Sequence, residues 1–404
     1  MLRTLVVSVE PLWPEVHGGR LRTARLAEAL SRAGHQVTVA APSQGERTAA
    51  PPGISTIDLG QWSAGTSAKL RASFSAGPRL GVLAVGSQAR LLQRLAADFD
   101  VVVWAHSYLA AAAGPLAGPV GVIDVANVEM DRFRSMAANA SFLARLPRRW
   151  EAVKALRWEP AAWRTADVCI TLNAADAACV RTAVDGTATR VVLGANGVDS
   201  HPYVPSPVSP VVALVASYRY PPNVDAARWV LEQVWPKVAS VVTDARLVLA
   251  GRDAAGAFVG SVAPGSNVEF VSDFDDPRAV HAAVSVVLAP VRFGGGTQLK
   301  VSEALSHHRV VVASPYSASA TPPTAAGTGA VVVADTADEW SATVSRLLLD
   351  TEQRHHLERQ LCRPGVVPTW DDTLGDAIAA IEVAKREHVG RTSGPAGDRG
   401  RSES

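Results

Sequence analysis

Short apolar runs alternate with longer segments of mixed character along most of this chain. Residues 5–9 and 35–41 form two of the runs, and the segment between them carries apolar residues at helical spacing up to Gly34. A strand, a helix over residues 20–33 and a second strand predict a βαβ unit with a parallel sheet. Further strands of the same sheet are predicted at residues 54–57, 101–104, 119–124, 168–172 and 190–193.

A change of composition separates this first sheet from a second one. Four prolines fall within residues 199–210, which is typical of a semi-rigid linker. Beyond the linker, the alternation of strand-like and helix-like segments starts again. The strands predicted there are residues 211–215, 245–250, 268–271, 286–289 and 310–313.

The chain is therefore expected to be an α/β protein with two Rossmann-like domains that face each other across a cleft. The first domain is predicted over residues 1–198 and the second over residues 211–368, joined by the linker 199–210. Residues 369–387 are expected to form a last helix that packs back toward the first domain. Residues 388–404 are predicted to be a disordered tail.

Bulk composition narrows the class of protein. Lys and Arg number 39 against 38 Asp and Glu, so no chain-wide positive field favours nucleic acid as a partner. Three scattered cysteines fit neither a disulfide framework nor a zinc site, and they suit a reducing compartment. The N-terminus lacks a signal-peptide layout, and no apolar run is long enough to span a bilayer. We expect a cytoplasmic protein without a transmembrane segment; a peripheral membrane contact and the oligomeric state stay open.

One basic segment stands out against this balanced charge. Residues 130–165 are rich in arginine, carry three tryptophans and are predicted to be helical. They could present a surface for acidic partners. The other interpretation, which we favour at this point, is an amphipathic helix that covers the sheet and turns a solvated polar face outward.

A glycine-rich loop follows the predicted strand 286–289. Gly294, Gly295 and Gly296 let the backbone approach a ligand closely, and Thr297 is a candidate N-cap for the helix that follows. Free amides at such a junction bind phosphate. Glu303 would lie near the same point, where its carboxylate can accept hydrogen bonds from ribose hydroxyls, so a nucleotide suits both features. A flexible turn with a solvated Glu303 is the alternative, and the residues alone do not decide between them.

Several short motifs occur in a fixed order along the chain. They are GGR at 18–20, DVANVE at 124–129, WRTADV at 163–168, ANGVD at 195–199, YPPNVDA at 220–226 and the glycine loop with TQLKVSEA at 297–304. In this order they resemble motifs of GT-B-fold glycosyltransferases, specifically the large retaining family 4 group. The resemblance implies transfer of a sugar from a nucleoside-diphosphate sugar, UDP- or GDP-linked, to a hydroxyl acceptor. It also implies retention of anomeric configuration, no cofactor, no metal, and a small-molecule, glycan or lipid-linked acceptor.

Some positions depart from the family pattern. The first of the two glutamates in the family signature falls on Gly295, and Gln298 replaces the usual arginine. After the helix, His307 and His308 replace a glycine-containing turn; they are adjacent and therefore not spaced as a metal-ligand pair. These changes bear on the base and acceptor specificity more than on the fold.

The resemblance assigns roles around the glycine loop. The Thr297 hydroxyl, the amides of Gln298 and Leu299 and the Lys300 charge are expected at the pyrophosphate, where fixed donors stabilise the leaving group. Glu303 is expected to hold the ribose. Lys300 as a surface cation and Glu303 in a structural salt bridge are the competing interpretations.

Other candidates lie outside that loop. Arg219 or Arg292 would add positive charge at the phosphates, and Arg252 would border the nucleotide base. Gly18 and Gly19 would bring their amides close to the phosphate and the acceptor. His106, after the strand 101–104, would hydrogen-bond the donor sugar, with a structural histidine as the alternative. Candidate acceptor contacts are Asn127 and Glu129.

Two further classes of function remain under consideration. Another GT-B enzyme, such as a sugar epimerase or an inverting transferase, would need an essential carboxylate or histidine base near the acceptor. A non-catalytic sugar-nucleotide-binding protein would bind the donor without releasing the nucleoside diphosphate. A dinucleotide dehydrogenase fits poorly, because no Gly-x-Gly-x-x-Gly follows the first strand.

Overall fold

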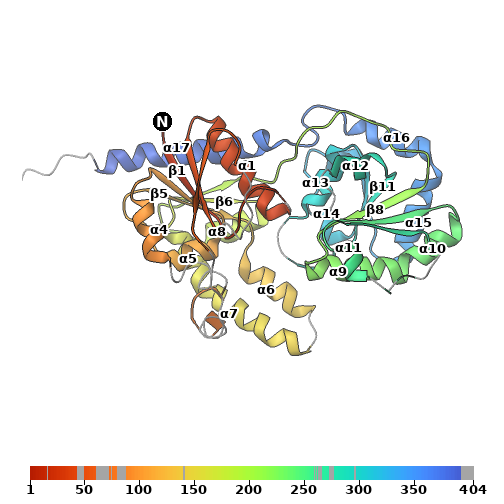
Figure 1. The fold of residues 1–404 in the computed structure, drawn as a ribbon, viewed down its shortest axis with the longest axis horizontal. Coiled ribbons are helices and arrows are strands. Elements are labelled where there is room, and N and C mark those ends of the chain that lie inside the picture. The colour runs from red at the N-terminus through yellow and green to blue at the C-terminus, as the bar shows by residue number, and fades with distance from the viewer. Residues whose placement is uncertain are drawn as a thin grey trace, which may run out of the picture. The chain divides into compact units, whose positions relative to one another are not determined.

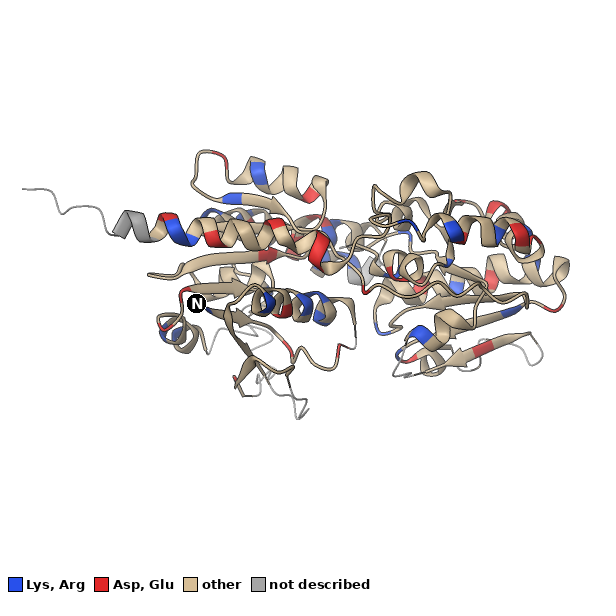
Figure 2. Cartoon of the chain, turned by 90° about the horizontal axis from the view of Figure 1, so that it is seen from above, with Lys and Arg blue, Asp and Glu red and all other residues tan. Residues whose placement is uncertain are grey.

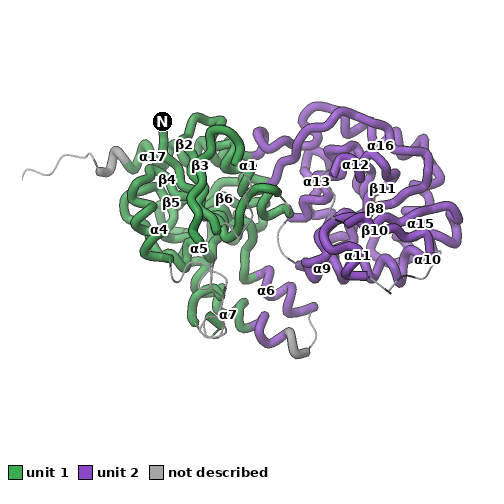
Figure 3. The backbone as a smooth tube through the Cα atoms, in the orientation of Figure 1, with its two compact units in different colours: residues 1–130, 150–195, 374–404 green, residues 131–149, 196–373 purple. Residues whose placement is uncertain are grey.

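The chain folds into two compact α/β units (Figure 1) in a computed structural model. The structure describes residues 1–15, 17–42, 50–60, 72–73, 75–79, 88–139, 142–258, 260, 262, 266–272, 277–294 and 297–392, without the side chains of 142–144 and 389–392. Unit 1 consists of residues 1–130, 150–195 and 374–404, and unit 2 of residues 131–149 and 196–373 (Figure 3).

Unit 1 contains a seven-stranded parallel sheet in the order β3-β2-β1-β4-β5-β6-β7. Its strands are β1 Arg3–Val7, β2 Gln36–Ala41, β3 Ile54–Asp58, β4 Val101–Trp104, β5 Val120–Val125, β6 Val168–Thr171 and β7 Arg190–Leu193. The four central strands are almost entirely buried. Valine-rich runs of this kind form parallel strands because helices must cover both faces of the sheet. The predicted first sheet is therefore confirmed.

Most of the helices described between residues 1 and 195 connect successive strands of this sheet, and a last helix comes from the C-terminal end of the chain. They are α1 Gly18–Arg32, α4 Ala89–Ala96, α5 Ser107–Ala113, α6 Glu129–Ala138, α7 Phe142–Arg164, α8 Ala174–Ala183 and α17 Trp370–Thr392. Helix α1 begins two residues before its predicted start, because the His17 side chain accepts a hydrogen bond from the Arg20 amide and caps the helix at Gly18.

Helix α17 closes the chain and belongs mostly to unit 1. Leu374, Ala377 and Ile381 on one side of it are fully buried, and Lys385 forms an ion pair with Asp100 at 3.2 Å. The helix continues to Thr392, so residues 388–392 are not the disordered segment predicted from the sequence. Residues 393–404 of the predicted tail lie outside the described part of the chain. Acidic and basic residues are interspersed along this and other surface helices (Figure 2).

Unit 2 contains a six-stranded parallel sheet in the order β10-β9-β8-β11-β12-β13. Its strands are β8 Val211–Val215, β9 Arg246–Ala250, β10 Val268–Val271, β11 Val286–Ala289, β12 Val310–Ala313 and β13 Val331–Val333. Its helices are α9 Pro221–Trp229, a π-helical turn Val230–Val234, α10 Trp235–Val241, α11 Ala254–Phe258, α12 Pro277–Ala282, α13 Leu299–Ser306, α14 Pro315–Ala318, a 3₁₀ turn Ala326–Thr328, α15 Ala337–Leu349 and α16 Thr351–Gln360. Strand β13 is an edge strand that the sequence did not predict.

Both faces of the second sheet are packed. Along β8, Val212 and Leu214 belong to one hydrophobic cluster, whereas Val211, Ala213 and Val215 belong to another. Successive side chains of a strand point to opposite faces, so the two clusters lie on opposite sides of the sheet. Unit 2 therefore has the α/β/α layers expected of a Rossmann-like domain.

The proline-rich segment 199–210 contains no helix or strand and is held by side chains of unit 2. The buried Arg354 donates hydrogen bonds to Ser206 Oγ and to Pro207 O, both at 2.8 Å. Arg309, also buried, donates to Val204 O at 2.8 Å. Three backbone and side-chain acceptors are thus fixed by two guanidinium groups. The segment predicted as a separate linker is anchored to the second unit.

The loops after β8 and β9 approach each other backbone to backbone. Gly251 has φ +129°, and a Cβ at this position would lie 2.0 Å from Ala216 O. Only glycine fits both the dihedral and the contact. Because Arg252 follows directly, this glycine also determines where the candidate base-contacting arginine lies.

We predict that Gly251→Ala lowers the free energy of unfolding by roughly 2–5 kcal/mol, from the backbone dihedral and the clash together. Urea unfolding followed by tryptophan fluorescence measures the change. Gly327→Ala is the matched control, because a Cβ there meets nothing within 4 Å and the backbone dihedral is ordinary. Equal stability of the two variants would contradict the close approach.

Candidate active site

The strand order of each sheet reverses at one point, and the candidate residues gather there. In unit 2 the reversal lies between the adjacent strands β8 and β11. The chain continues from β8 toward β9 on one side of this point and from β11 toward β12 on the other. In unit 1 the reversal lies between β1 and β4. Ligands of open α/β sheets bind outside the carboxyl ends of the strands at such a point.

Lys300, in the first turn of α13, is the central cation of the unit 2 site. Its Nζ donates a hydrogen bond to Asn223 Oδ1 at 2.7 Å. Asn223, in the first turn of α9, is buried, and its Nδ2 donates to Ser217 O at 2.8 Å in the loop after β8. This second bond fixes the amide so that its oxygen faces the lysine. Lys300 is thus held in place by a neutral partner that leaves its charge uncompensated.

Glu303 lies one helical turn after Lys300. Both residues keep part of their surface accessible, yet their charged ends lie among protein atoms. Desolvation raises the pKa of Glu303 to about 7, although the Lys300 charge opposes the shift. Desolvation also lowers the pKa of Lys300 to about 8, and here Glu303 opposes the shift. A carboxyl and an amine with such displaced pKa values are typical of a functional site.

The start of α13 differs from the prediction. The helix begins at Leu299 with Gln298 as its N-cap residue, so Thr297 is not the cap. The Thr297 hydroxyl instead accepts a hydrogen bond from Asn196 Nδ2. The Leu299 amide donates to Thr297 O at 3.0 Å, within a tight turn, which makes it a weaker candidate for a phosphate contact than expected.

Gly294 is the described residue of the triple-glycine loop. Its φ is +139°, and a Cβ would lie 2.8 Å from the Tyr220 hydroxyl. Glycine is therefore required where the loop passes Tyr220. Gly295, which replaces the family glutamate, and Gly296 lie outside the described residues.

The three candidate arginines of unit 2 have different surroundings. Arg292 forms an ion pair with Asp225 at 2.8 Å and lies over the Trp229 ring, so a carboxylate already compensates its charge. Arg219 is exposed in the loop after β8. Arg252 is half-buried directly after β9, and its carbonyl accepts the Tyr218 amide at 2.9 Å. Arg219 is the better placed of the two proposed sources of extra positive charge.

His307 and His308, at the far end of α13, do not form a metal site. The His307 ring stacks on His201 at 3.9 Å and on His281 at 4.5 Å between centroids. Stacked rings do not direct their nitrogens at one point. Within the ranges that the structure describes, no group of three or more His, Cys, Asp or Glu residues is placed to hold a metal ion.

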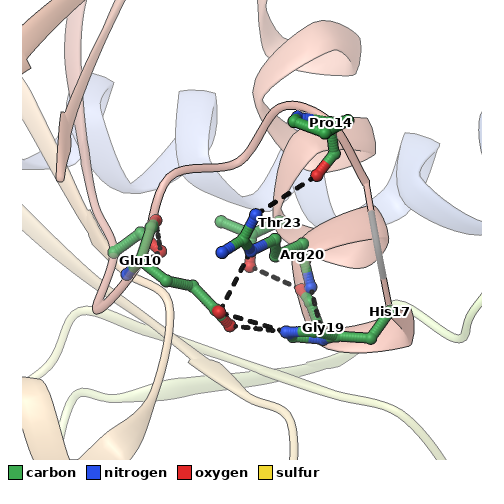
Figure 4. Close-up of polar contacts among 7 residues, drawn as sticks. Glu10, Pro14, His17, Gly19, Arg20 and Thr23 are labelled. Atoms are coloured by element: carbon green, nitrogen blue, oxygen red, sulfur yellow. Dashed lines mark hydrogen bonds and ion pairs between the residues drawn. The ribbon is translucent and has the colours of Figure 1, made fainter. Parts of the chain in front are cut away.

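In unit 1, Gly18 and Gly19 form the exposed first turn of α1 instead of a preceding loop. The amides of a first helical turn have no partner within the helix. Next to them, Glu10 accepts hydrogen bonds from His17 Nε2 and from Arg20 Nε, both at 3.0 Å (Figure 4). A carboxylate, an imidazole and a guanidinium thus surround the start of the helix.

The pKa of Glu10 reflects these neighbours. Burial by itself raises it, but the hydrogen bonds and charges of His17 and Arg20 together outweigh burial and hold it below its ordinary value. A second carboxylate, Asp124 on β5, is buried in a 2.6 Å ion pair with Arg22 of α1. The contacts of Glu10 with His17 and Arg20 lie at the start of α1, whereas the ion pair between Arg22 and Asp124 joins α1 to the sheet.

The remaining candidates of unit 1 lie just beyond strand ends, as predicted. His106 follows β4, occupies the N-cap position of α5 and stacks on Tyr108 with 4.8 Å between the ring centroids. It is half-buried. Asn127 lies after β5, and Glu129 opens α6 with its side chain buried.

Family models agree with this arrangement. One described as glycosyltransferase family 4 matches residues 16–201, and one described as glycosyl transferases group 1 matches residues 209–350. Together they account for most of the chain. The chain belongs to the group 1 glycosyltransferases.

Solved structures show that this glycosyltransferase has the GT-B fold. Sucrose-phosphate synthase from Thermosynechococcus elongatus is 17% identical with a TM-score of 0.71, over 97% of this chain and 100% of that one. WaaG, a glycosyltransferase involved in lipopolysaccharide biosynthesis, is 16% identical with a TM-score of 0.63, over 97% and 100%. Anabaena HepE in complex with UDP and glucose is 14% identical with a TM-score of 0.57, over 98% and 100%. The search of curated proteins returned no match.

The sequence did not predict a role for two residues that contact the candidate site of this glycosyltransferase. Asn223 binds Lys300, and Asn196 binds Thr297. Both lie within motifs that carry the family resemblance, which was the available signal. What the motifs could not show was the partner of each side chain.

We predict that the combined contribution of Glu303 and Lys300 to the unfolding free energy of the ligand-free glycosyltransferase passes through a minimum near pH 7–8, measured as the difference between wild type and variants that lack these groups. Glu303 favours its protonated form in the fold, and this stabilisation is complete below pH 4.5 and is lost as the pH rises through about 7. Lys300 favours its neutral form in the fold, so stability rises again between about pH 8 and 10.5. Chemical denaturation across this range measures the profile.

Variants assign the two sides of that minimum. Glu303→Gln should remove the fall and Lys300→Met the rise. Glu339→Gln is the control, because the backbone hydrogen bonds of Asp335 and Thr336 lower the pKa of this exposed carboxyl, which therefore stays ionised in the neutral and alkaline range. A profile identical in wild type and Glu303→Gln would show that Glu303 ionises normally.

Proposed function

We propose that the protein transfers a sugar from a nucleoside-diphosphate sugar to a hydroxyl acceptor, with retention of anomeric configuration and without a metal ion. The observation that carries this proposal is the Lys300–Asn223 hydrogen bond beside Glu303, at the strand-order reversal of unit 2. A cation held by a neutral amide and a carboxyl of raised pKa suit a diphosphate and a ribose. The family membership supplies the reaction class.

Lys300 and Glu303 would act on different parts of the donor. The Lys300 ammonium would neutralise the charge that develops on the diphosphate as the anomeric bond breaks. The ribose hydroxyls would donate to Glu303, which favours the ionised carboxylate and lowers its raised pKa. Asn223 is neutral, so it positions Lys300 without adding a negative charge that would compete with the phosphates.

The proposed chemistry needs no carboxylate nucleophile. The bond between the anomeric carbon and the phosphate oxygen breaks, and its electron pair stays on that oxygen. The acceptor hydroxyl gives its proton to the same oxygen and bonds to the anomeric carbon on the same face. In unit 1, the first-turn amides at Gly18 and Gly19 and the ring of His106 would orient the phosphate and the sugar.

The hydrogen bond between Glu10 and His17 favours a second candidate function, an inverting sugar transfer. A carboxylate that holds an imidazole is the arrangement of a general base, which an inverting transferase needs at its acceptor. The stereochemistry of the product separates the two reactions. Inversion together with loss of activity in His17→Ala would favour the second candidate and reject retention.

We predict that a panel of UDP-, GDP-, ADP- and dTDP-sugars contains one donor that raises the melting temperature by a few degrees at saturation. UDP- and GDP-sugars are the first choice; the structures of HepE with UDP and of a UDP-forming trehalose-phosphate synthase from Burkholderia vietnamiensis share the fold. The shift should shrink in Lys300→Ala and Glu303→Ala. No shift with any of the four donors would contradict the donor site.

With that donor, we predict that Lys300→Ala and Glu303→Ala lower turnover by about 10²–10³-fold, because each removes a contact that strengthens in the transition state. Asn223→Ala should give a smaller loss. Lys237→Ala is the control, since Lys237 is exposed and pairs with Asp338 on the surface. The same reaction should continue in EDTA and give a product of unchanged anomeric configuration by NMR; wild-type kinetics in both site variants would exclude the assignment.

A further inference from the structure

Helix α7 carries an apolar stripe on the side that faces solvent. The stripe consists of residues that are 45–65% exposed, namely Leu146, Trp150, Val153 and Leu156. At 3.6 residues per turn, these four positions fall within an arc of about 120°. Exposed apolar residues are common singly, but a contiguous group on one surface marks an interaction site.

The opposite side of the same helix is already occupied by the core of unit 1. Ala155, Trp158 and Ala162 are buried there. Beyond the stripe, Trp163 is also buried, and its indole donates a hydrogen bond to Ser107 Oγ at 3.0 Å. Packing against the sheet therefore accounts for one apolar side of α7 and leaves the other unexplained. The prediction that this helix covers the sheet is confirmed. Its outward face is not purely polar, however, because exposed apolar residues lie there beside the arginines.

Positive charge accompanies the stripe. Arg149 and Arg157 are exposed and fall within the same arc. Residues 131–157 contain seven Lys or Arg and two Asp or Glu, a net charge of +5 in a chain whose total is +1. The excess of the whole chain is therefore concentrated in α6 and α7, and the remaining residues are net acidic.

Trp150 is the largest side chain of the stripe and is only partly covered by the protein. Its indole N–H donates to Ser73 O at 3.0 Å, so its polar edge is satisfied by the protein. Half of the residue is nevertheless exposed. Tryptophan and leucine together with arginine are residues that helices at a membrane surface use, the first two for burial and arginine for anionic lipid. In α7 the arginines lie between the apolar residues of the stripe.

We propose that the α7 stripe docks this enzyme on an anionic lipid surface, with the apolar side chains among the acyl-chain ends and the arginines at the headgroup phosphates. The stripe is too short to cross a bilayer, and no helix in the described part of the chain is long and apolar enough to do so. The surface goes beyond the proposed sugar transfer and does not depend on it.

Charge distinguishes a lipid surface from the other occupants. A second copy of this chain would bring the same arginines against each other, and like charges oppose such a contact. An acidic protein would pair with the arginines but would need its own apolar patch to cover the four stripe residues. An anionic bilayer supplies both chemistries at once.

Vesicle co-sedimentation tests the proposal on the full-length protein. Phosphatidylcholine vesicles with about one third phosphatidylglycerol should carry down most of the protein at low salt, and phosphatidylcholine alone should carry down little. Raising the salt from about 0.1 M to 1 M should weaken binding, because screening shortens the reach of the arginines. The double variant Val153→Glu and Leu156→Glu should bind at least about tenfold more weakly, through lost burial and added negative charge.

A matched double variant separates docking from a general loss of exposed apolar surface. Val241→Glu and Leu349→Glu change two comparably exposed residues on helices of unit 2 and should leave vesicle binding unchanged. The blue shift of tryptophan fluorescence on binding should shrink in Trp150→Phe. Both double variants should keep the melting temperature and the donor-induced shift, which keeps this test apart from that of the transfer reaction.

Three outcomes would overturn the proposal. They are absence of binding to the anionic vesicles, equal binding of the two double variants, and equal binding to vesicles with and without phosphatidylglycerol. Concentration-dependent dimerisation that the α7 variant alone abolishes, without any vesicle binding, would assign the stripe to a second copy of the chain. Vesicle binding that is lost only in the α7 variant would support a lipid surface.

Discussion

Parallel strand pairing is the constraint on which both units depend. When every strand runs in one direction, all carboxyl ends share one edge and helices must cover both faces. Where the order reverses, between β8 and β11 or between β1 and β4, neighbouring loops diverge and leave room for a ligand. Lys300, Asn223 and His106 lie beside those two places, and the valine-rich strand interiors carry none of the candidate chemistry.

Within unit 2, packing changes the chemistry of ordinary side chains. Lys300 and Glu303 are one turn apart on a short helix, a spacing that occurs on many solvated surfaces. Here the surrounding protein atoms partly desolvate both, so that the carboxyl becomes a weaker acid and the ammonium a stronger one. A neutral partner, Asn223, then positions the lysine without cancelling its charge. The result is a site arranged to receive negative charge.

Helix α7 shows the same dependence on packing at the surface. Its apolar residues surround the helix, so the sequence pattern alone does not tell which side is buried. The fold buries Trp158 and Trp163 against unit 1 and leaves Trp150 and Leu156 outside. A basic segment that looked like a solvated cover for the sheet thereby gains an apolar docking face.

The sequence by itself determined the two parallel sheets, the strand ends that carry His106 and Arg252, and the helix that carries Lys300 and Glu303. These features depend on local periodicity and on the direction of the chain, which neighbouring residues encode. Tertiary structure alone decided that Asn223 binds Lys300 across 77 residues and that Asn196 binds Thr297 across 101. It also decided which side of α7 meets solvent. Such pairings and exposures arise from distant segments in contact, and no local pattern specifies them.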